Sequence, residues 1–388
     1  MNFWETLPRP VIGLAPMDGV TDAGFRSVVA QQGKPDVIFT EFTHVHDVCL
    51  GPEHLLDTLI YSEIERPIVA QLYGNNPGLF YRAAYAVCEL GFDGLDINMG
   101  CPSKSVASSG SGAGLIRTPE LARAIIREAK RGIDDWASGR TLEQAGFQPE
   151  KAAVFRRLNE RRGGQARVER RSIPLSVKTR IGYDAVTVEP WLEQLVAERP
   201  AAISLHGRTL KQMYRGSADW SAIARAARMV GGTGILLLGN GDIQSLHEAA
   251  TRVRETGVDG VLVGRSVLGA PWFFREKERA RTVVQRTNEA DVGWDEQEVP
   301  LSRRFAVLLD HARQFEAFCG PNRFYRMRKH LAWYCKGFPR AAALRARMVR
   351  VSSIGELESI LDDYLNDRLL PALTEGVDDE LEPVSRCG

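Results

Sequence analysis

The sequence lacks paired cysteines, long apolar runs and a secretion signal. Its six cysteines are scattered over 388 residues without a CxxC motif, which argues against a disulfide framework or a zinc site and fits a reducing compartment. No apolar run approaches the roughly 20 residues that span a bilayer. The first residues also lack the basic and apolar regions of a signal peptide. We therefore expect a cytoplasmic protein with no membrane segment.

Net charge is nearly absent as well, at +1 for 50 basic and 49 acidic residues. That average hides a basic region near the C-terminus, where 12 basic residues lie between Arg303 and Arg350 against only Asp310 and Glu316. Such a segment fits either a polyanionic partner or an ordinary solvated helix surface. Charge alone does not separate the two.

Short apolar runs alternate with helix-like segments over most of the chain. The runs are rich in Val, Ile and Leu with little alternation, as in strands buried on both faces. This repeat predicts a TIM (β/α)8 barrel over residues 1–285, with a doubly wound open sheet as the alternative. The predicted strands are Val11–Pro16, Val37–Phe42, Pro67–Gly74, Gly94–Gly100, Leu175–Arg180, Ala201–Arg208, Gly234–Ile243 and Gly260–Arg265.

Two segments depart from the repeat. After a helix predicted over Pro119–Lys130, residues 132–172 exceed what a βα unit needs. We interpret them as a surface insertion at the N-terminal face of the barrel, with RNA contact as the alternative. After a polar linker, helical spacing resumes at Pro300 and predicts a small all-α C-terminal domain over 300–373. We expect residues 374–388 to form a disordered tail.

Polar or reactive residues follow nearly every predicted strand. In a TIM barrel the chemistry lies at the C-terminal ends of the strands, so these residues should line one pocket. They are Pro16–Asp18, Glu41, Gln71, Asn98, Cys101, Lys178, Arg180, His206, Arg208, Asn240, Gly241, Asp242, Gly264 and Arg265.

The last two strand ends have the composition of a phosphate site. Gly241, Gly264 and Arg265 lie in the loops that frequently bind phosphate in TIM barrels, where glycines allow backbone N–H groups to approach the anion. Lys178 would be costly to bury without an anionic or polar partner. The pattern predicts a phosphate-bearing ligand.

The remaining polar residues favour a heterocyclic ligand over a metal. Gln71 and Asn98 offer amide donors and acceptors that can read the edge of a ring. His44 and His46 lack carboxylate support, so we expect no metal site. A redox-active ring that becomes anionic on reduction would also provide a partner for Lys178.

Cys101 lies where its strand should end, between a Gly and a Pro that restrict the backbone. A thiol in such a cleft can act as a nucleophile, paired with His206, or as a general acid. It can also be an ordinary buried apolar residue. The residues alone leave these alternatives open.

Several short motifs follow one another along most of the chain. They are Leu14-Ala15-Pro16-Met17, Gln71-Leu72-Tyr73-Gly74, Asp96-Ile97-Asn98-Met99-Gly100-Cys101-Pro102, Val177-Lys178-Thr179-Arg180, His206-Gly207-Arg208-Thr209, Asn240-Gly241-Asp242-Ile243, Gly264-Arg265 and Arg328-Lys329-His330-Leu331-Ala332-Trp333-Tyr334. In this order they resemble the tRNA-dihydrouridine synthase family. The chain departs from that family in the long segment Gly132–Ser172.

The resemblance implies an FMN enzyme that reduces the C5–C6 double bond of uridine in tRNA with NADPH or NADH. Cys101 would donate the proton to C5 of the base. The implied cofactor-binding residues are Pro16, Met17, Asp18, Gln71, Lys178, His206, Asn240, Gly241, Asp242, Gly264 and Arg265. The implied substrate-binding residues are Asn98, Arg180 and Arg208 in the barrel and Arg323, Arg326, Arg328 and Lys329 in the basic region.

We expect tRNA as partner and a monomeric protein. A flavin-dependent barrel enzyme that acts on a free metabolite, similar to dihydroorotate dehydrogenase, is one alternative. An RNA-binding protein with an inactive barrel is the other. The basic C-terminal domain disfavours the first, because a small substrate needs no such surface. The presence of Lys178 and Cys101 disfavours the second.

Overall fold

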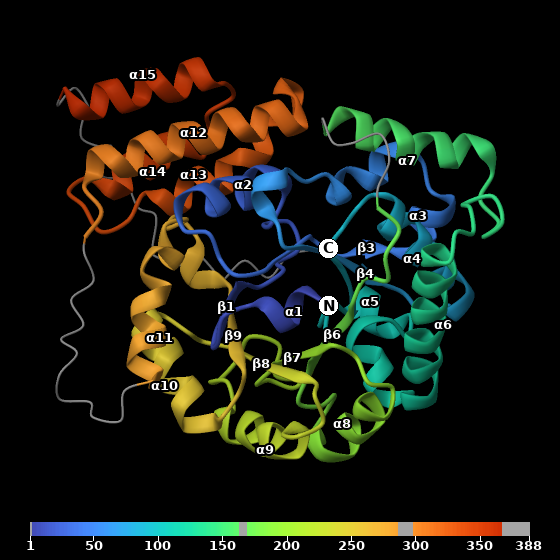
Figure 1. Cartoon of the computed structure of the whole chain (residues 1–388). Coiled ribbons are helices and arrows are strands. Elements are labelled where there is room, and N and C mark those ends of the chain that lie inside the picture. Colours follow the sequence, from blue (N-terminus) through green and yellow to red (C-terminus); the bar gives the residue numbers. More distant parts are fainter. Residues whose placement is uncertain (1, 163–168, 286–297, 367–388) are drawn as a thin grey trace.

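A barrel of parallel strands carries most of the chain. The computed structural model describes residues 2–162, 169–285 and 298–366 (Figure 1). The strands are β1 (Val11–Leu14), β2 (Ile38–Phe39), β3 (Thr43–His44), β4 (Ile68–Tyr73), β5 (Gly94–Met99), β6 (Leu175–Arg180), β7 (Ala202–His206), β8 (Leu236–Asn240) and β9 (Gly260–Val263).

The strands close on themselves. They are paired in the order β1-β9-β8-β7-β6-β5-β4-β2, and β3 also pairs with β4. Two backbone hydrogen bonds join the ends of that order, from Leu14 N to Val37 O and from Asp36 N to Ile12 O, both at 3.0 Å. The predicted TIM barrel is confirmed. The open-sheet alternative is wrong, because its outer strands would be unpaired edges.

Helices surround the strands and continue into a C-terminal bundle (Figure 1). The α-helices are α1 (Phe3–Thr6), α2 (Ala23–Gln32), α3 (Val45–Leu50), α4 (Pro77–Glu89), α5 (Lys104–Ser108), α6 (Pro119–Ala137), α7 (Pro149–Arg161), α8 (Val188–Ala197), α9 (Trp220–Val230), α10 (Leu246–Thr256), α11 (Lys277–Gln285), α12 (Leu301–Cys319), α13 (Arg328–Tyr334), α14 (Ala341–Met348) and α15 (Ile354–Leu365). The 3₁₀ turns are η1 (Glu53–Leu59), η2 (Glu63–Glu65), η3 (Gly112–Arg117), η4 (Arg265–Val267), η5 (Phe273–Glu276) and η7 (Pro321–Met327). None of these helices has the length and apolar character needed to cross a membrane.

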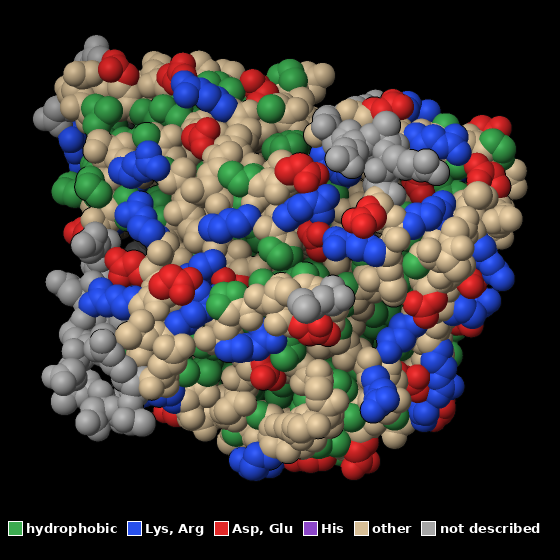
Figure 2. All heavy atoms as spheres, in the orientation of Figure 1, with side chains coloured by type: hydrophobic (Ala, Val, Ile, Leu, Met, Phe, Trp, Pro, Cys, Tyr) green, Lys and Arg blue, Asp and Glu red, His purple; other side chains and the backbone are tan. Residues whose placement is uncertain are grey.

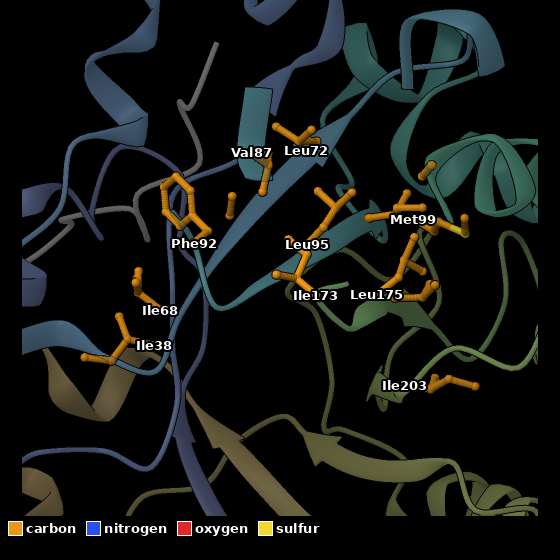
Figure 3. Packing of buried hydrophobic residues seen from close by; sticks show 14 of the residues in the cluster. Ile38, Ile68, Leu72, Val87, Phe92, Leu95, Met99, Ile173, Leu175 and Ile203 are labelled. Atoms are coloured by element: carbon orange, nitrogen blue, oxygen red, sulfur yellow. The ribbon is translucent and has the colours of Figure 1, made fainter. Parts of the chain in front are cut away.

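Alternate strand residues face the helices and the barrel interior. On β5, Leu95 and Met99 pack in the outer layer with Val87 of α4 and with Leu175 (Figure 3). Each such fully buried side chain contributes roughly 1.5–3 kcal/mol to folding. The alternate residues Asp96 and Asn98 are also buried but belong to no apolar cluster, so the interior of the barrel carries polar groups.

Helix α1 covers the N-terminal end of the barrel. Trp4 is 1% exposed and lies against Phe39, with ring centroids 6.3 Å apart. A Cβ added to Gly94, the first residue of β5, would lie 3.1 Å from the Phe3 ring. The face that carries α1 intermixes Lys and Arg with Asp and Glu (Figure 2). Basic side chains therefore do not gather on this side of the molecule.

The second predicted strand is divided in two. In place of one strand over Val37–Phe42, the chain forms β2 and then β3, and both pair with β4. Between them Thr40 N donates to Val69 O at 3.0 Å and the Thr40 hydroxyl accepts from Gln71 N at 3.0 Å. A side chain thus replaces one backbone bond of the ladder, which a sequence pattern does not reveal.

The insertion extends α6 to Ala137 and adds α7. Cationic side chains of α7 bind the carbonyls that end two barrel helices. Lys151 Nζ donates to Gly51 O at 2.6 Å after α3, and Arg162 donates to Leu90 O at 2.6 Å after α4. Cations are favourable at helix C-termini. Helix α7 therefore lies along the α3–α4 flank and reaches beyond the N-terminal face where we placed the insertion.

The C-terminal helices have their own apolar core and dock on α2. Phe315 of α12 and Leu331 of α13 are fully buried in this core, which also takes in Val28 of α2. A Cβ on Gly24 of α2 would lie 2.9 Å from the Phe315 backbone, so the two helices approach closely. The predicted tail 374–388, the last residues of the predicted domain and most of the linker lie outside the described residues.

Candidate active site

The C-terminal ends of β4–β8 bring the predicted residues together in successive layers. Strand register places Gln71 opposite Asp96 and Asp96 opposite Ser176. One layer further toward the mouth, Lys178 lies between Asn98 and Ser204. The outermost layer aligns Arg180, His206 and Asn240. The register therefore places these strand-end residues at one end of the barrel, which we call the mouth.

The turn that carries Cys101 is held from both sides. The Asn98 Oδ1 atom accepts hydrogen bonds from Gly100 N at 3.0 Å and Cys101 N at 2.8 Å. On the other side, Arg180 Nε donates to Gly100 O at 2.6 Å. Cys101 is 8% exposed. The backbone of the turn is therefore fixed, and Cys101 is buried without belonging to an apolar cluster.

Lys178 and Arg180 are cations of the mouth that form no direct ion pair within the described residues. Arg180 is buried and binds only the carbonyls of Gly100, Thr209 and Met213. Burial, followed by the Arg180 charge, lowers the pKa of the half-buried Lys178 to about 8, and the charge of Asp96 acts in the opposite direction. Burial also lowers the pKa of Arg180 to about 10. Two adjacent cations with this little direct compensation fit an anionic ligand.

His206 is held neutral. Burial and four neighbouring cations, Arg180 first among them, place its pKa well below the ordinary value. In the described part of the chain no hydrogen bond reaches its ring. His206 therefore forms no hydrogen bond with Cys101 among the described residues, and the general-acid interpretation of Cys101 stays a prediction.

The predicted phosphate loop contains an ion-pair network. Both Asp242 oxygens bind the Arg208 guanidinium, at 2.9 and 2.6 Å, and one also binds Arg265 at 2.8 Å. These bonds and the Arg208 charge lower the Asp242 pKa against the effect of burial. Gly241 has φ +132, and a Cβ there would lie 2.6 Å from Ala218 Cβ, so only glycine fits. Arg208 is thus engaged by its own chain, while Arg265 stays 55% exposed.

The β1 loop closes the same mouth from the opposite side. A Cβ added to Gly264 would lie 3.3 Å from Met17 Sδ, so the β1 and β9 loops are adjacent. Burial raises the pKa of Asp18. Lys329 of the helical domain donates to Gly19 O, which places this lysine at the rim of the barrel.

The predicted basic contacts of the helical domain differ in how they are bound. Arg323 pairs with Asp57 of η1 at 2.5 Å. Arg328 donates to Val351 O at 2.8 Å. Arg326 is half-buried and forms no hydrogen bond or ion pair within the described ranges. Of the predicted residues in this domain, Arg326 has the guanidinium that is open to a phosphate.

Sequence reasoning gave no role to three residues that the structure singles out. Glu41, predicted only as a strand-end residue, follows β2, is 4% exposed, and has its pKa raised to about 7 by burial. Tyr325, next to Arg326, is 61% exposed. Asp96 was noted only as part of a motif, although it is fully buried and bonded to Gln71. A carboxylate within an apolar strand was the one available signal.

His44, His46 and Asp47 offer ligand atoms within 4.8 Å of one another. The His44 Nδ1 atom already accepts from His46 N at 3.3 Å. The ring of His44 packs on Tyr73 with centroids 4.8 Å apart. These contacts explain the arrangement without an ion, and the absence of a metal stays a prediction.

Fold and site together define a class: a (β/α)8-barrel enzyme with a cysteine and two cations at the C-terminal ends of its strands. The chain belongs to the dihydrouridine synthase (Dus) family. The family model matches residues 13–138 and 164–369 and leaves much of the insertion unmatched.

Relatives cover nearly the whole chain. The probable tRNA-dihydrouridine synthase 2 of Bacillus subtilis is 32% identical over 94% of this chain and 96% of its own length. A probable tRNA-dihydrouridine synthase of Staphylococcus epidermidis is 31% identical over the same shares. The crystal structure of TcOYE with pHBA covers 72% of this chain and 90% of its own, at 12% identity and a TM-score of 0.44. That score is too low to bear on fold or function.

Proposed function

We propose that this protein is an oxidoreductase that forms dihydrouridine in tRNA by reducing the C5–C6 double bond of uridine. Its membership of the dihydrouridine synthase family and the names of its relatives support this activity. The observation that carries the proposal is the placement of Cys101 next to a mouth with two unpaired cations. Family membership favours this function over a free-metabolite reductase and over an inactive RNA-binding barrel.

FMN fits the residues of the mouth. Arg265 and the backbone of Gly264 would hold its phosphate, because the arginine is half-exposed and begins the turn η4. Lys178 would lie against the ring and offset the negative charge that the ring acquires on reduction. When bound, FMN supplies hydride to C6 of the base after reduction by NADPH or NADH. The preference between the two nicotinamides is left to experiment.

Cys101 would hold the proton that C5 receives. Its turn is fixed by Asn98 and Arg180, so the thiol keeps one position relative to the mouth. Both Lys178 and Arg180 interact electrostatically with the thiol sulfur. These cations stabilise the thiolate that remains after proton transfer. The side chains thus support a general acid.

The helical domain would hold the tRNA backbone. Arg326 has no partner among the described residues, and Tyr325 presents an exposed ring beside it. A uridine within tRNA must leave its stack to enter a barrel mouth, so a grip on the phosphates outside the pocket is needed. A monomer in the cytoplasm is sufficient for this activity.

The decisive experiment uses the purified full chain with FMN, NADPH and tRNA from cells that lack dihydrouridine. Mass spectrometry of the digested tRNA should show dihydrouridine, formed only when the reductant is present. A preparation that binds flavin and oxidises NADPH with other acceptors but leaves tRNA unmodified would contradict the proposal.

A further inference from the structure

Buried polar side chains form a continuous hydrogen-bonded chain behind Cys101. Ser176 Oγ donates to Asp96 Oδ1 at 2.6 Å, and Gln71 Nε2 donates to Asp96 Oδ2 at 2.7 Å. Asn98 Nδ2 then donates to Gln71 Oε1 at 2.9 Å. Asn98 Oδ1 in turn accepts from the backbone N–H of Cys101. This series of hydrogen bonds, from Ser176 through Asp96, Gln71 and Asn98 to the Cys101 backbone, is called the relay. It runs from β6 across β5 and β4 and returns to the Cys101 turn.

The direction of this chain is fixed at both ends. The Asp96 carboxylate only accepts, so Gln71 must turn its NH₂ group toward it. The backbone N–H groups of Gly100 and Cys101 only donate, so Asn98 must turn its oxygen toward them. Between these ends each carboxamide has one possible orientation.

These bonds limit what Asn98 can offer a ligand. Its oxygen already accepts two hydrogen bonds, and one N–H is given to Gln71. The side chain is 6% exposed, and its remaining polar group is a single N–H donor. A ligand group that meets Asn98 must therefore be an acceptor. Uracil carries ring carbonyl oxygens at positions 2 and 4, whereas cytosine has one at position 2 only.

Asp96 is unusual for an interior position. It is 0% exposed, and within the described residues it forms no ion pair. Burial raises its pKa to about 6, although the bonds from Ser176 and Gln71 and the Lys178 charge act in the opposite direction. A buried carboxylate lowers the stability of the fold unless hydrogen bonds compensate for its lost hydration. An apolar residue at this position would avoid that cost, so packing alone does not explain Asp96.

We propose that Asp96 is a positioning residue: through Gln71 it orients Asn98 and the Cys101 turn, so that the mouth presents a hydrogen-bond donor to a carbonyl oxygen of the base. This deepens and rests on the proposed function, since it names the group of the substrate that Asn98 recognises. Asp96 itself touches neither substrate nor cofactor.

The relay can be broken, and then restored, by exchanging the hydrogen-bond donor and acceptor between positions 71 and 96. In Gln71→Glu, two carboxylates face each other, and the interior is forced to expel one or take up a proton. Loss of a charged buried hydrogen bond should lower kcat for tRNA by about 10- to 100-fold, with a smaller change in KM. Activity should recover as the pH falls, because one proton shared by Asp96 and the introduced carboxylate restores the bridge.

The double variant D96N/Q71E provides the matched control. Its new amide can donate to the new carboxylate, and that carboxylate can still accept from Asn98. The orientation of Asn98 is thereby preserved, so kcat at saturating flavin should be at least 10-fold above that of Gln71→Glu and should no longer improve at low pH. A general disturbance of the core would make the double variant worse than Gln71→Glu. No rescue, or an unaffected Gln71→Glu, would overturn the relay.

A second measurement keeps the relay separate from the proposed function. The rate at which iodoacetamide alkylates Cys101, followed by mass spectrometry, reports the Cys101 turn without tRNA or cofactor. The alkylation rate should differ from that of wild type in Gln71→Glu, and it should return to the wild-type rate in D96N/Q71E. If wild type forms no dihydrouridine while this rescue holds, the proposed function is wrong and the relay stands. If wild type is active and neither measurement shows rescue, the relay is wrong.

Discussion

The cations of the barrel mouth and those of the helical domain differ in the contacts that they form within the protein. Lys178 and Arg180 form no ion pair within the described residues: Arg180 binds only carbonyl oxygens, and the charge of the buried Asp96 acts on Lys178 without a direct bond. In the helical domain Arg323 binds the Asp57 carboxylate, and Lys329 binds the carbonyl of Gly19. A carboxylate of the barrel thus contacts Arg323 directly, and neither cation of the mouth has such a contact.

This difference separates a ligand site from a docking surface. A buried charge without a partner costs several kcal/mol, so it persists where a ligand supplies the missing charge. Exposed pairs such as Arg323 with Asp57 contribute only about 0–1 kcal/mol each. Their effect here is to orient the helical domain on the barrel. Sequence motifs alone placed Arg180 of the mouth in the same list of substrate-binding residues as Arg323 and Lys329.

The largest expected effect separates binding from chemistry in the mouth. Cys101→Ala should lower dihydrouridine formation by about 10²- to 10⁴-fold, the usual contribution of a general acid. Flavin affinity should be unchanged, because the cations that bind it remain. The measurements are single-turnover dihydrouridine formation and flavin fluorescence titration. Cys319→Ala, at a half-buried cysteine of the helical domain, is the control. Equal activity in both variants would remove Cys101 from the mechanism.

The second prediction concerns the unpaired charge itself. Lys178→Met should weaken FMN binding by about 10- to 100-fold, since it removes a charged contact of roughly 1.5–3 kcal/mol. In wild type the affinity should fall as the pH rises through about 8, where Lys178 loses its proton. In the variant this pH dependence should vanish. A wild-type affinity that stays constant between pH 7 and 9 would show that Lys178 does not face the anion.

The strand ends were predictable because β-strands impose a period of two and parallel strands share one edge. This rule placed Asn98, Lys178 and His206 at one mouth. Hydrogen bonds and ion pairs that join side chains to neighbouring loops were not predictable. The ion pair of Arg208 with Asp242 and the bond of Lys329 to the Gly19 carbonyl depend on side-chain reach across loops that have no period. The split of the second strand and the course of α7 also depend on such bonds.

The third prediction tests the junction between the two regions. His311 and His330 are fully buried against Asp22 of α2, with their rings 4.9 Å apart. Burial lowers the pKa of His311 to about 3 and also lowers that of His330. Unfolding therefore takes up protons below the unfolded pKa of about 6.5. Stability should fall by about 1.4 kcal/mol per pH unit for His311 as the pH drops from 6.5 toward 3.

Urea unfolding of the full chain at pH 7.0, 6.0 and 5.0 measures this slope. His311→Gln should flatten it, because the variant has no proton to take up at this site. His54→Gln, at an exposed histidine of η1, should leave it as in wild type. A slope that is the same in all three proteins would place the pH dependence elsewhere. The raised pKa values of Glu41 and Asp96 act on stability in the opposite direction, but they are common to all three proteins and cancel in the comparison.

The smallest effect distinguishes cations within the helical domain. Arg326→Ala should weaken tRNA binding by a few-fold and reduce the slope of log affinity against log salt by about 1, as expected for one lost phosphate contact. Arg328→Ala removes the same charge from the same turn of chain, but that guanidinium is engaged by Val351 O. Its salt slope should stay close to wild type. Filter binding of tRNA between 50 and 200 mM salt compares the two. If both slopes fall equally, an arginine that is bonded within the protein can still contact RNA. The cations of the mouth and of the helical domain would then differ in burial but not in availability to a ligand.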